Sequence, residues 1–234
     1  MKRALLTGVG RVGQVGEAVA ARLVVDGFEL ILVDRTAENV QARAEALRAA
    51  GGRATGYACD LSDPDALAGL ARQVADRHGP SLDAVVHMAG GFAATGPVAD
   101  TAVADWDRQL TINLRTAFLT ARTTVPMLRI GGGSMVFFSS EVAIPGAKLS
   151  RISSYAVAKI GVVALAIAIS QEERSARIRA NIVAPASIRT ASNVASMGPG
   201  ASFVEREDVA ATVAYLCSDA ARGLTGQIFR LGPR

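Results

Sequence analysis

Short apolar runs alternate along the chain with longer segments that mix polar and apolar positions. The runs 4–6 and 30–33 are continuously apolar, which is typical of strands buried on both faces of a parallel sheet. The alternation predicts an α/β fold, a doubly wound parallel sheet in three α/β/α layers, and one domain over 1–234. Further strands are expected at 53–58, 83–88, 134–138, 179–184 and 226–230, and helices at 18–26, 38–50, 63–78, 105–129, 153–173 and 206–218.

Composition narrows the possible functions. Half of the 234 residues are apolar and a fifth are charged, which is typical of an ordinary globular protein. The net charge of +4 is scattered and only 5% of residues are aromatic, so we expect no nucleic-acid partner. Cys59 and Cys217 are expected to be buried free thiols, and two histidines are too few for a multi-histidine metal site.

The longest apolar stretch, 160–169, is half the length of about twenty residues that a membrane-spanning helix needs. Glycine and polar residues interrupt the apolar stretch directly after the basic residues Lys2 and Arg3, so no secretory signal is expected. We therefore expect a cytoplasmic protein with no membrane partner.

A glycine-rich loop follows the first expected strand. It reads Thr-Gly-Val-Gly-Arg-Val-Gly-Gln-Val-Gly over 7–16 and leads into the first helix. Glycine lets the backbone approach a ligand closely, and the free N–H groups at a helix N-terminus attract phosphate. Alone, such a loop is only a turn, but after the first strand of an alternating chain it predicts a dinucleotide site.

Acidic residues follow the next two strands. Asp34 closes the second strand, where a carboxylate accepts hydrogen bonds from an adenosine ribose and repels a 2′-phosphate, so NAD is favoured over NADP. Arg35 and Arg11 keep NADP open, because either could pair with that phosphate. Asp60, with Leu61, is a candidate for the adenine amino group or for a helix N-cap, although Ser62 or Asp63 suits a cap better.

The pair Tyr155 and Lys159 lies one helical turn apart in the expected helix 153–173. An ammonium group beside a phenol lowers the phenol pKa, which makes Tyr155 a candidate general base for an alcohol and general acid for a ketone. Alone, the spacing is more typical of a solvated helix face. Ser139 and Ser140 end the strand 134–138, where a hydroxyl could hold a substrate oxygen near the tyrosine or simply begin a turn.

Taken in order, the motifs make the chain resemble the short-chain dehydrogenase/reductase family over 3–229. The resemblance implies a Rossmann fold with a built-in catalytic site. It is carried by Thr7-Gly8 to Gly16, Asp60-Leu61, Ala89-Gly90, Asn113, Ser139-Ser140, Tyr155 with Lys159, and Asn181, Pro185 and Thr190.

The resemblance implies four catalytic roles. Tyr155 would transfer the proton, Ser140 would orient the carbonyl, Lys159 would lower the tyrosine pKa and grip the ribose, and Asn113 would hold a water. The backbone at Ile188 and the Thr190 side chain would hold the nicotinamide carboxamide. The expected cofactor contacts are Gly8, Gly10, Arg11, Gly13, Val15, Gly16, Asp34, Arg35, Asp60, Leu61, Ala89, Gly90, Tyr155, Lys159, Pro185, Ile188 and Thr190.

The chain also departs from the family pattern. The glycine loop is two residues longer than usual, and the family's middle glycine is either replaced by Gln14 or displaced to Gly13. His87 occupies an asparagine position and is expected to be a strand-end residue rather than a catalyst. Only sixteen residues separate Thr190 from Glu207, so the substrate lid is expected to be a short loop over 191–203 that leaves the site open.

The helix 153–173 is apolar nearly all round and needs cover on every side. In the family the cover is the same helix of a second subunit, so we expect a homodimer or homotetramer. Cover by the chain's own helix at 105–129 would instead leave a monomer.

The sequence thus favours an NAD(P)-dependent oxidoreductase that interconverts a secondary alcohol and a carbonyl of a small molecule. One alternative is an NADPH-dependent 3-oxoacyl-carrier reductase, in which Lys148 and Arg151 would meet an acidic carrier, although both could be ordinary surface charges. Another is a nucleotide-binding sensor or scaffold that performs no chemistry.

Overall fold

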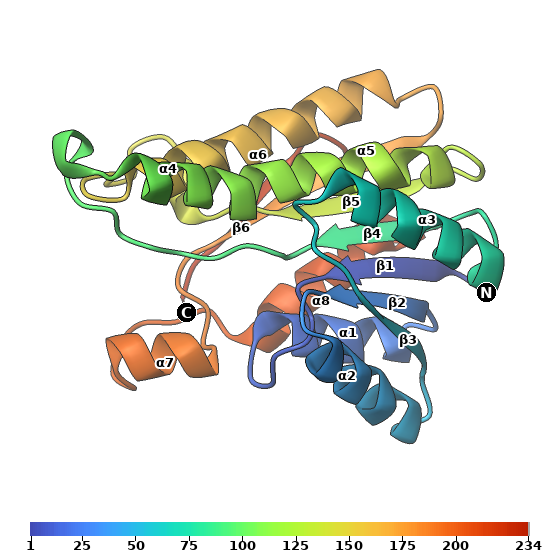
Figure 1. The fold of residues 1–234 in the computed structure, drawn as a ribbon. Coiled ribbons are helices and arrows are strands. Elements are labelled where there is room, and N and C mark those ends of the chain that lie inside the picture. The colour runs from blue at the N-terminus through green and yellow to red at the C-terminus, as the bar shows by residue number, and fades with distance from the viewer. Residues whose placement is uncertain (234) are drawn as a thin grey trace.

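Seven parallel strands form one sheet in the order β3-β2-β1-β4-β5-β6-β7 (Figure 1), in a computed structural model that describes residues 1–233. This order confirms the predicted doubly wound sheet, because the chain starts at the centre, moves to one edge and returns to build the other half. The strands are β1 (Arg3–Thr7), β2 (Glu29–Asp34), β3 (Arg53–Ala58), β4 (Ala84–His87), β5 (Gly133–Phe138), β6 (Ile178–Pro185) and β7 (Ile228–Leu231).

Helices cover both faces of the sheet and complete the three layers (Figure 1). On one face lie α1 (Val15–Val25), α2 (Ala37–Ala49) and α8 (Arg206–Cys217), and on the other lie α3 (Pro64–His78), α5 (Thr116–Leu128) and α6 (Ser153–Glu172). The remaining helices are α4 (Val103–Leu110) and α7 (Ala191–Met197).

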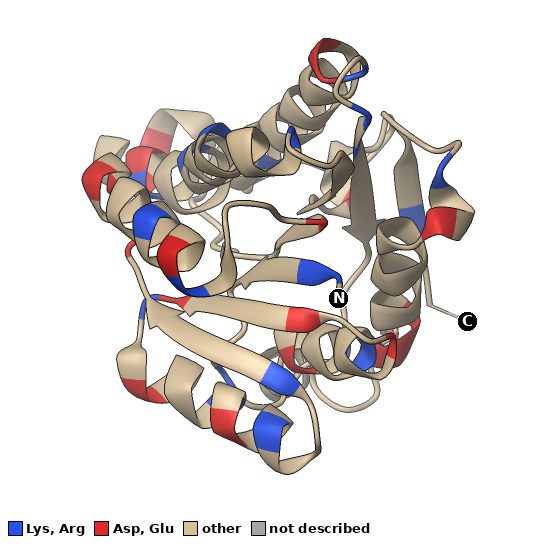
Figure 2. Cartoon of the chain, turned by 90° about the vertical axis from the view of Figure 1, so that its right-hand side faces the viewer, with Lys and Arg blue, Asp and Glu red and all other residues tan. Residues whose placement is uncertain are grey.

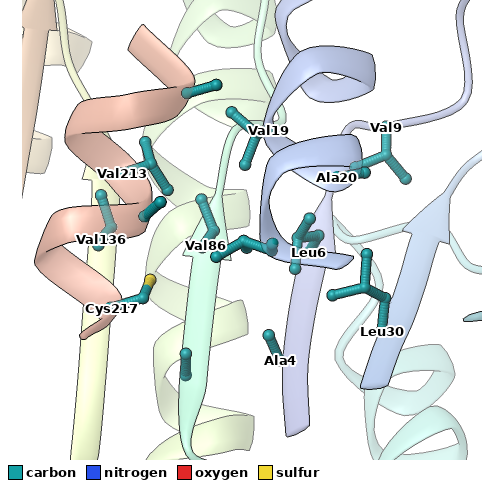
Figure 3. Packing of buried hydrophobic residues seen from close by; sticks show 14 of the residues in the cluster. Ala4, Leu6, Val9, Val19, Ala20, Leu30, Val86, Val136, Val213 and Cys217 are labelled. Carbon is teal, nitrogen blue, oxygen red and sulfur yellow. The ribbon is translucent and has the colours of Figure 1, made fainter. Parts of the chain in front are cut away.

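Each face of the sheet carries its own apolar core. Leu6 of β1 and Val86 of β4 project towards α1 and α8, where Val19 and Val213 meet them (Figure 3). The opposite face buries residues such as Phe137 against α3, α5 and α6. A strand flanked by two cores must be apolar at successive positions, which explains why continuous apolar runs predicted β1 and β2.

Both cysteines are buried free thiols, as predicted. Burial raises the pKa of Cys59 to about 11 and that of Cys217, on α8, to about 12. Both side chains therefore remain protonated at neutral pH. Acidic and basic residues are interspersed over the helices in view (Figure 2), consistent with a scattered excess of positive charge.

Two predicted elements differ in the structure. The helix expected over 105–129 is interrupted by a π-helical segment, Thr111–Arg115, between α4 and α5. The prediction of a loop over 191–203 was wrong for the first half of that segment, which forms α7. Thr190 begins that helix, since its Oγ1 accepts a hydrogen bond from the Asn193 N–H at 3.2 Å.

Helix α6 is long and apolar enough to cross a membrane by length and composition, but half of its most apolar window is buried inside the chain. It packs against β6, α4 and the π-helical segment. Its apolar character on most sides therefore fits a helix that packs within the core of the fold.

Candidate active site

Tyr155 and Lys159 lie in the first turns of α6, near the carboxyl end of β5. The Lys159 Nζ lies 5.8 Å from the centre of the Tyr155 ring and donates a hydrogen bond to the Phe138 carbonyl oxygen at 3.0 Å. The lysine is buried, whereas the tyrosine is half-buried. The structure thus brings the expected pair together, one helical turn apart and at the end of a central strand.

The electrostatics of this pair differ in one respect from the expectation. Burial lowers the pKa of Lys159 to about 8, since an ammonium group loses hydration there. Burial also raises the pKa of Tyr155 above its ordinary value, and a hydrogen bond with the Ser140 side chain offsets only part of that rise. The Tyr155 pKa thus lies above its ordinary value, contrary to the lowering expected from Lys159.

The two serines after β5 have different surroundings. Ser139 is buried, and its Oγ donates to the Lys159 carbonyl oxygen at 2.9 Å, which ties α6 to the strand end. Ser140 is half-buried and shares a hydrogen bond with Tyr155. Of the two serines, Ser140 is therefore the one whose side chain lies beside the phenol.

Asn113 sits at the middle of the π-helical segment and is fully buried. Its Nδ2 donates to the carbonyl oxygens of Gly91 at 2.9 Å and Gln109 at 3.1 Å, and its Oδ1 accepts from the Gly91 N–H at 3.1 Å. π-Helical turns are often found at functional sites because they shift the register of the helix. Here the shift lets one amide clamp the backbone that follows β4.

That backbone also lies close to the lysine. A Cβ added to Gly90 would lie 2.5 Å from Asn113 Oδ1 and 3.4 Å from Lys159 Nζ, and the Gly90 φ is +156°. Glycine is thus required for the close approach of this segment to the two polar side chains. Gly90 and Ala89 lie at the same rim of the sheet as Tyr155.

The glycine loop has the close backbone packing that a dinucleotide site requires. Gly8 has a φ of +74°, and an added Cβ would lie 2.8 Å from the Ala89 nitrogen. At Gly16 an added Cβ would lie 2.7 Å from the Gly8 carbonyl oxygen, so the first turn of α1 packs directly on the loop. Gln14 begins α1 without a side-chain cap, which leaves the N-terminal turn available to a phosphate.

The residues beyond the strand ends fit the adenosine half of such a ligand. Asp34 accepts hydrogen bonds from the Gly10 N–H at 2.9 Å and the Thr36 N–H at 3.3 Å, so its carboxylate is fixed at the end of β2. Asp60 is exposed, and hydrogen bonds from the Ser62 hydroxyl and N–H lower its pKa. Asp63, not Asp60, caps α3, accepting from two N–H groups of the first turn.

The other predicted adenosine-side residues have simple positions. Arg11 and Arg35 are exposed beside the loop and after β2, while Leu61 is buried after β3. Val15 is the first residue of α1 and is half-buried. This arrangement leaves both arginines accessible to a phosphate.

The residues expected beside the nicotinamide make several hydrogen bonds within the protein. Pro185 ends β6, and the Ile188 carbonyl oxygen accepts from the Thr190 N–H and from Asn193 Nδ2, both at 2.8 Å. Because the Thr190 hydroxyl also caps α7, it has a structural function besides the carboxamide contact that the resemblance implies.

The extra length of the glycine loop contacts α7. The Gly13 carbonyl oxygen accepts from the Ala191 N–H at 3.0 Å, and Gln14 Oε1 accepts from Ser192 Oγ at 3.0 Å. The Gly13 N–H donates to Glu17 Oε2 at 2.8 Å. The lengthened loop and the shortened lid are thus in direct contact.

Glu17 links this loop to two further elements. Its carboxylate pairs with Arg43 of α2 at 2.7 Å and with Arg206 of α8 at 3.3 Å. Hydrogen bonding by Gly13 and Arg43, with the charge of Arg206, outweighs burial and leaves the Glu17 pKa below its ordinary value. The two arginines offset a negative charge that would otherwise oppose a phosphate at the α1 N-terminus.

His87 has a structural environment. It ends β4, is buried, and burial lowers its pKa to about 3, so it is neutral at physiological pH. Thr7 Oγ1 accepts from the N–H groups of Met88 and Ala89, so its proton points to His87 Nδ1 at 3.1 Å. The ring proton then lies on Nε2, which faces Thr116 Oγ1 at 3.4 Å. These bonds support the interpretation of His87 as a strand-end residue.

The sequence did not single out Ser192, which meets the loop from the lid, or Glu17, which links helices, and it marked Gln14 only as a departure within the glycine loop. Their pairings join segments far apart in the chain, so no local pattern carried a signal for them. The structure also places the ring of Phe92 5.1 Å from that of Tyr155.

Comparisons with known proteins agree with this geometry. A family model described as Enoyl-(Acyl carrier protein) reductase matches residues 8–231. D-threitol dehydrogenase of Mycolicibacterium smegmatis is 30% identical, over 96% of this chain and 89% of that protein. Cis-4-hydroxycyclohexanecarboxylate dehydrogenase of Sinomonas cyclohexanicum is 32% identical, over 90% of this chain and 88% of that protein.

Solved structures show the same likeness. A short-chain type dehydrogenase/reductase from Mycobacterium ulcerans superposes with a TM-score of 0.89 at 29% identity, covering 100% of this chain and 92% of that one. Levodione reductase superposes with a TM-score of 0.87 at 28% identity, covering 99% and 96%. Members of this family use nicotinamide cofactors. By sequence and by fold, the chain belongs to the short-chain dehydrogenase/reductase family of oxidoreductases.

Proposed function

We propose that the protein is an NAD(P)-dependent oxidoreductase that interconverts a secondary alcohol and a ketone, with Tyr155 as the proton-transfer group. The observation that carries this proposal is the meeting of Tyr155, Lys159, Ser140 and Asn113 at the carboxyl rim of the sheet, beside a glycine loop that fits a dinucleotide. The curated relatives named above are dehydrogenases of hydroxyl compounds, which supports the reaction class.

The residues divide the chemistry between them. A bound nicotinamide ring supplies or accepts the hydride. The Tyr155 hydroxyl gives its proton to the ketone oxygen during reduction, and the Tyr155 phenolate takes the alcohol proton during oxidation. Ser140 holds the same substrate oxygen, and the Lys159 ammonium stabilises the phenolate that forms after proton donation. Asn113 contributes indirectly: its side-chain amide hydrogen-bonds to the backbone of Gly91 and so fixes the segment after β4.

The cofactor preferred by this site is NAD. The fixed Asp34 carboxylate presents negative charge where a 2′-phosphate would lie, whereas Arg11 and Arg35 are exposed side chains, and the charge of Arg35 acts on Asp60. Fluorescence titration with NADH and NADPH tests this choice. Tighter binding of NADPH would overturn it.

The proposal also includes the oligomeric state and the location: a homodimer or homotetramer in the cytoplasm. The chain's own α4 and π-helical segment cover only part of α6, and Val157 and Ile160 remain exposed at 45% and 44%. An open groove along α4 and α5 is lined by Leu110, Leu114 and Phe118 together with the polar residues Ser62, Asp107, Thr111 and Arg115. Light scattering at micromolar protein concentration tests the oligomeric state. A mass equal to one subunit would contradict the proposed oligomer.

The decisive test of the reaction is Tyr155→Phe. The variant removes one hydroxyl, and we expect kcat/KM to fall at least about a hundredfold because general acid–base catalysis is lost. NADH binding should change little. The matched control is Tyr215→Phe on α8, an exposed tyrosine remote from the site, which should keep full activity.

Two results would contradict the proposal. Equal activity in the Tyr155→Phe variant would remove the tyrosine from the mechanism. Nucleotide binding without turnover across a panel of ketones, 3-oxoacyl thioesters included, would favour a binding protein that does no chemistry.

A further inference from the structure

Phe92 is an exposed aromatic side chain beside the proposed proton-transfer group. Its ring is 64% exposed, although its centre lies 5.1 Å from that of Tyr155 in an edge-to-face contact at 85°. The contact covers one part of the phenylalanine and leaves the rest open at the rim of the sheet. A large apolar surface left uncovered next to a reacting group is the type of surface that a ligand buries.

The backbone that carries Phe92 is fixed on both sides. Before it, Gly91 exchanges two hydrogen bonds with the Asn113 amide at 3.1 and 2.9 Å. After it, the Thr95 N–H donates to the Arg151 carbonyl oxygen at 3.0 Å, and the Thr95 hydroxyl lies 3.1 Å from the Ser154 hydroxyl. Since Ser154 directly precedes Tyr155, the same contacts set the distance between the two rings.

Because the backbone is held on both sides of Phe92, mobility of the loop does not explain why this side chain is exposed. The exposed part of its ring is held in place before any ligand arrives, so a flat group can stack on it with little loss of conformational freedom. Aromatic rings bury a large area and gain a further geometric attraction from ring contacts. Short alkyl groups offer neither the area nor the ring contact.

We propose that Phe92 is a specificity-determining residue, which selects ketones and alcohols that carry an aromatic ring on the reacting carbon. The inference rests on the proposed function, because it takes Tyr155 as the group that meets the substrate oxygen. An aromatic substituent next to that oxygen reaches the Phe92 ring, since the two protein rings already touch. The preference expected from such a contact is about tenfold, equal to about 1.4 kcal/mol.

The test compares acetophenone with 2-butanone as substrates of the wild-type protein and of Phe92→Leu. Leucine keeps an apolar side chain but removes the ring. We expect the ratio of kcat/KM for acetophenone to that for 2-butanone to fall about tenfold in the variant, mainly through acetophenone. The control is Ile130→Ala, which alters another exposed apolar residue, 60% exposed, just beyond α5, and should leave the ratio unchanged.

Two results would overturn the inference. A ratio that stays within twofold in Phe92→Leu would show that the ring selects nothing. An equal fall for both ketones would mean that Phe92 only positions Tyr155.

Saturation-transfer NMR with acetophenone separates this inference from the proposed function. If the wild-type protein turned over no ketone of the panel named above, the proposed function would fail, but ring-proton signals would still report acetophenone bound to the protein. We expect these signals in the wild-type protein and their loss in Phe92→Leu. Equal signals in both proteins would refute the role of Phe92.

Discussion

The buried Lys159 side chain is expected to lower the free energy of unfolding of this protein. Its ammonium group is buried, and burial holds its pKa near 8 instead of the ordinary 10.5. Because a tenfold change in proton affinity is about 1.4 kcal/mol, the buried charge costs on the order of 3 kcal/mol. Substitution by methionine removes that cost but leaves the Phe138 carbonyl oxygen without its 3.0 Å donor, a loss of about 1 kcal/mol.

The net expectation for Lys159→Met is a gain of about 2 kcal/mol at pH 7, or roughly 4–8 °C in Tm for a domain of this size. The sign depends on pH. Below pH 8 the lysine is protonated in both folded and unfolded states, so the full cost is present. Between 8 and 10.5 the unfolded chain binds the proton and the folded one does not, so the stability of the wild-type protein rises with pH and the advantage of methionine shrinks.

Thermal unfolding followed by circular dichroism at pH 7 and pH 10 measures both parts. Lys148→Met is the control, because Lys148 is exposed and its substitution should leave Tm nearly unchanged at both pH values. A Lys159→Met protein no more stable than the wild type at pH 7, or one whose advantage persists at pH 10, would refute the reasoning. The gain should accompany a loss of activity, as expected where a functional group is retained against stability.

Two further predictions concern the glycine loop and the phenol. Gly16→Ala should lower stability by about 1–3 kcal/mol and weaken NADH binding, because its Cβ would lie 2.7 Å from the Gly8 carbonyl oxygen. Gly69→Ala, in open space on α3, should instead raise Tm; a stable Gly16→Ala protein that binds NADH normally would contradict the packing. Because burial raises the pKa of Tyr155, kcat/KM for ketone reduction should stay level through neutral pH and fall only in strongly alkaline buffer, while that for alcohol oxidation rises with pH. A fall in reduction already at neutral pH would show that the phenol is not the acid.

Local patterns were sufficient for the sheet and for the centre of the site. Strands buried on both faces are continuously apolar, so β2 could be read from residues 30–33 alone. The spacing of Tyr155 and Lys159 is itself a helical signal, and α6 places both at the end of β5. Residues that follow a strand in sequence lie at its carboxyl rim in space, which is why Ser140 could be assigned to the same place.

Contacts between distant segments could not be predicted in the same way. The Ser192–Gln14 hydrogen bond joins residues 178 positions apart, and no periodicity or composition encodes it. The helix α7 was expected to be a loop because small residues dominate its sequence, yet the Thr190 cap starts it there. The pKa of Tyr155 was expected to fall because Lys159 was considered without burial, and burial is the main cause of the raised pKa.

The two departures from the family pattern, a longer glycine loop and a shorter lid, are understood best together. The first N–H of α7, at Ala191, has no partner within its own helix and donates to the Gly13 carbonyl oxygen. Gly13 in turn has a φ of +72°, and a Cβ there would lie 2.9 Å from the Ala191 Cβ, so the loop can meet the helix only as glycine. Behind it, Glu17 accepts a hydrogen bond from the Gly13 N–H and pairs with Arg206, the first residue of α8. Each change, seen alone in the sequence, suggests a weakened site; in the fold, loop and lid form one hydrogen-bonded unit, so neither segment can be altered without affecting the other.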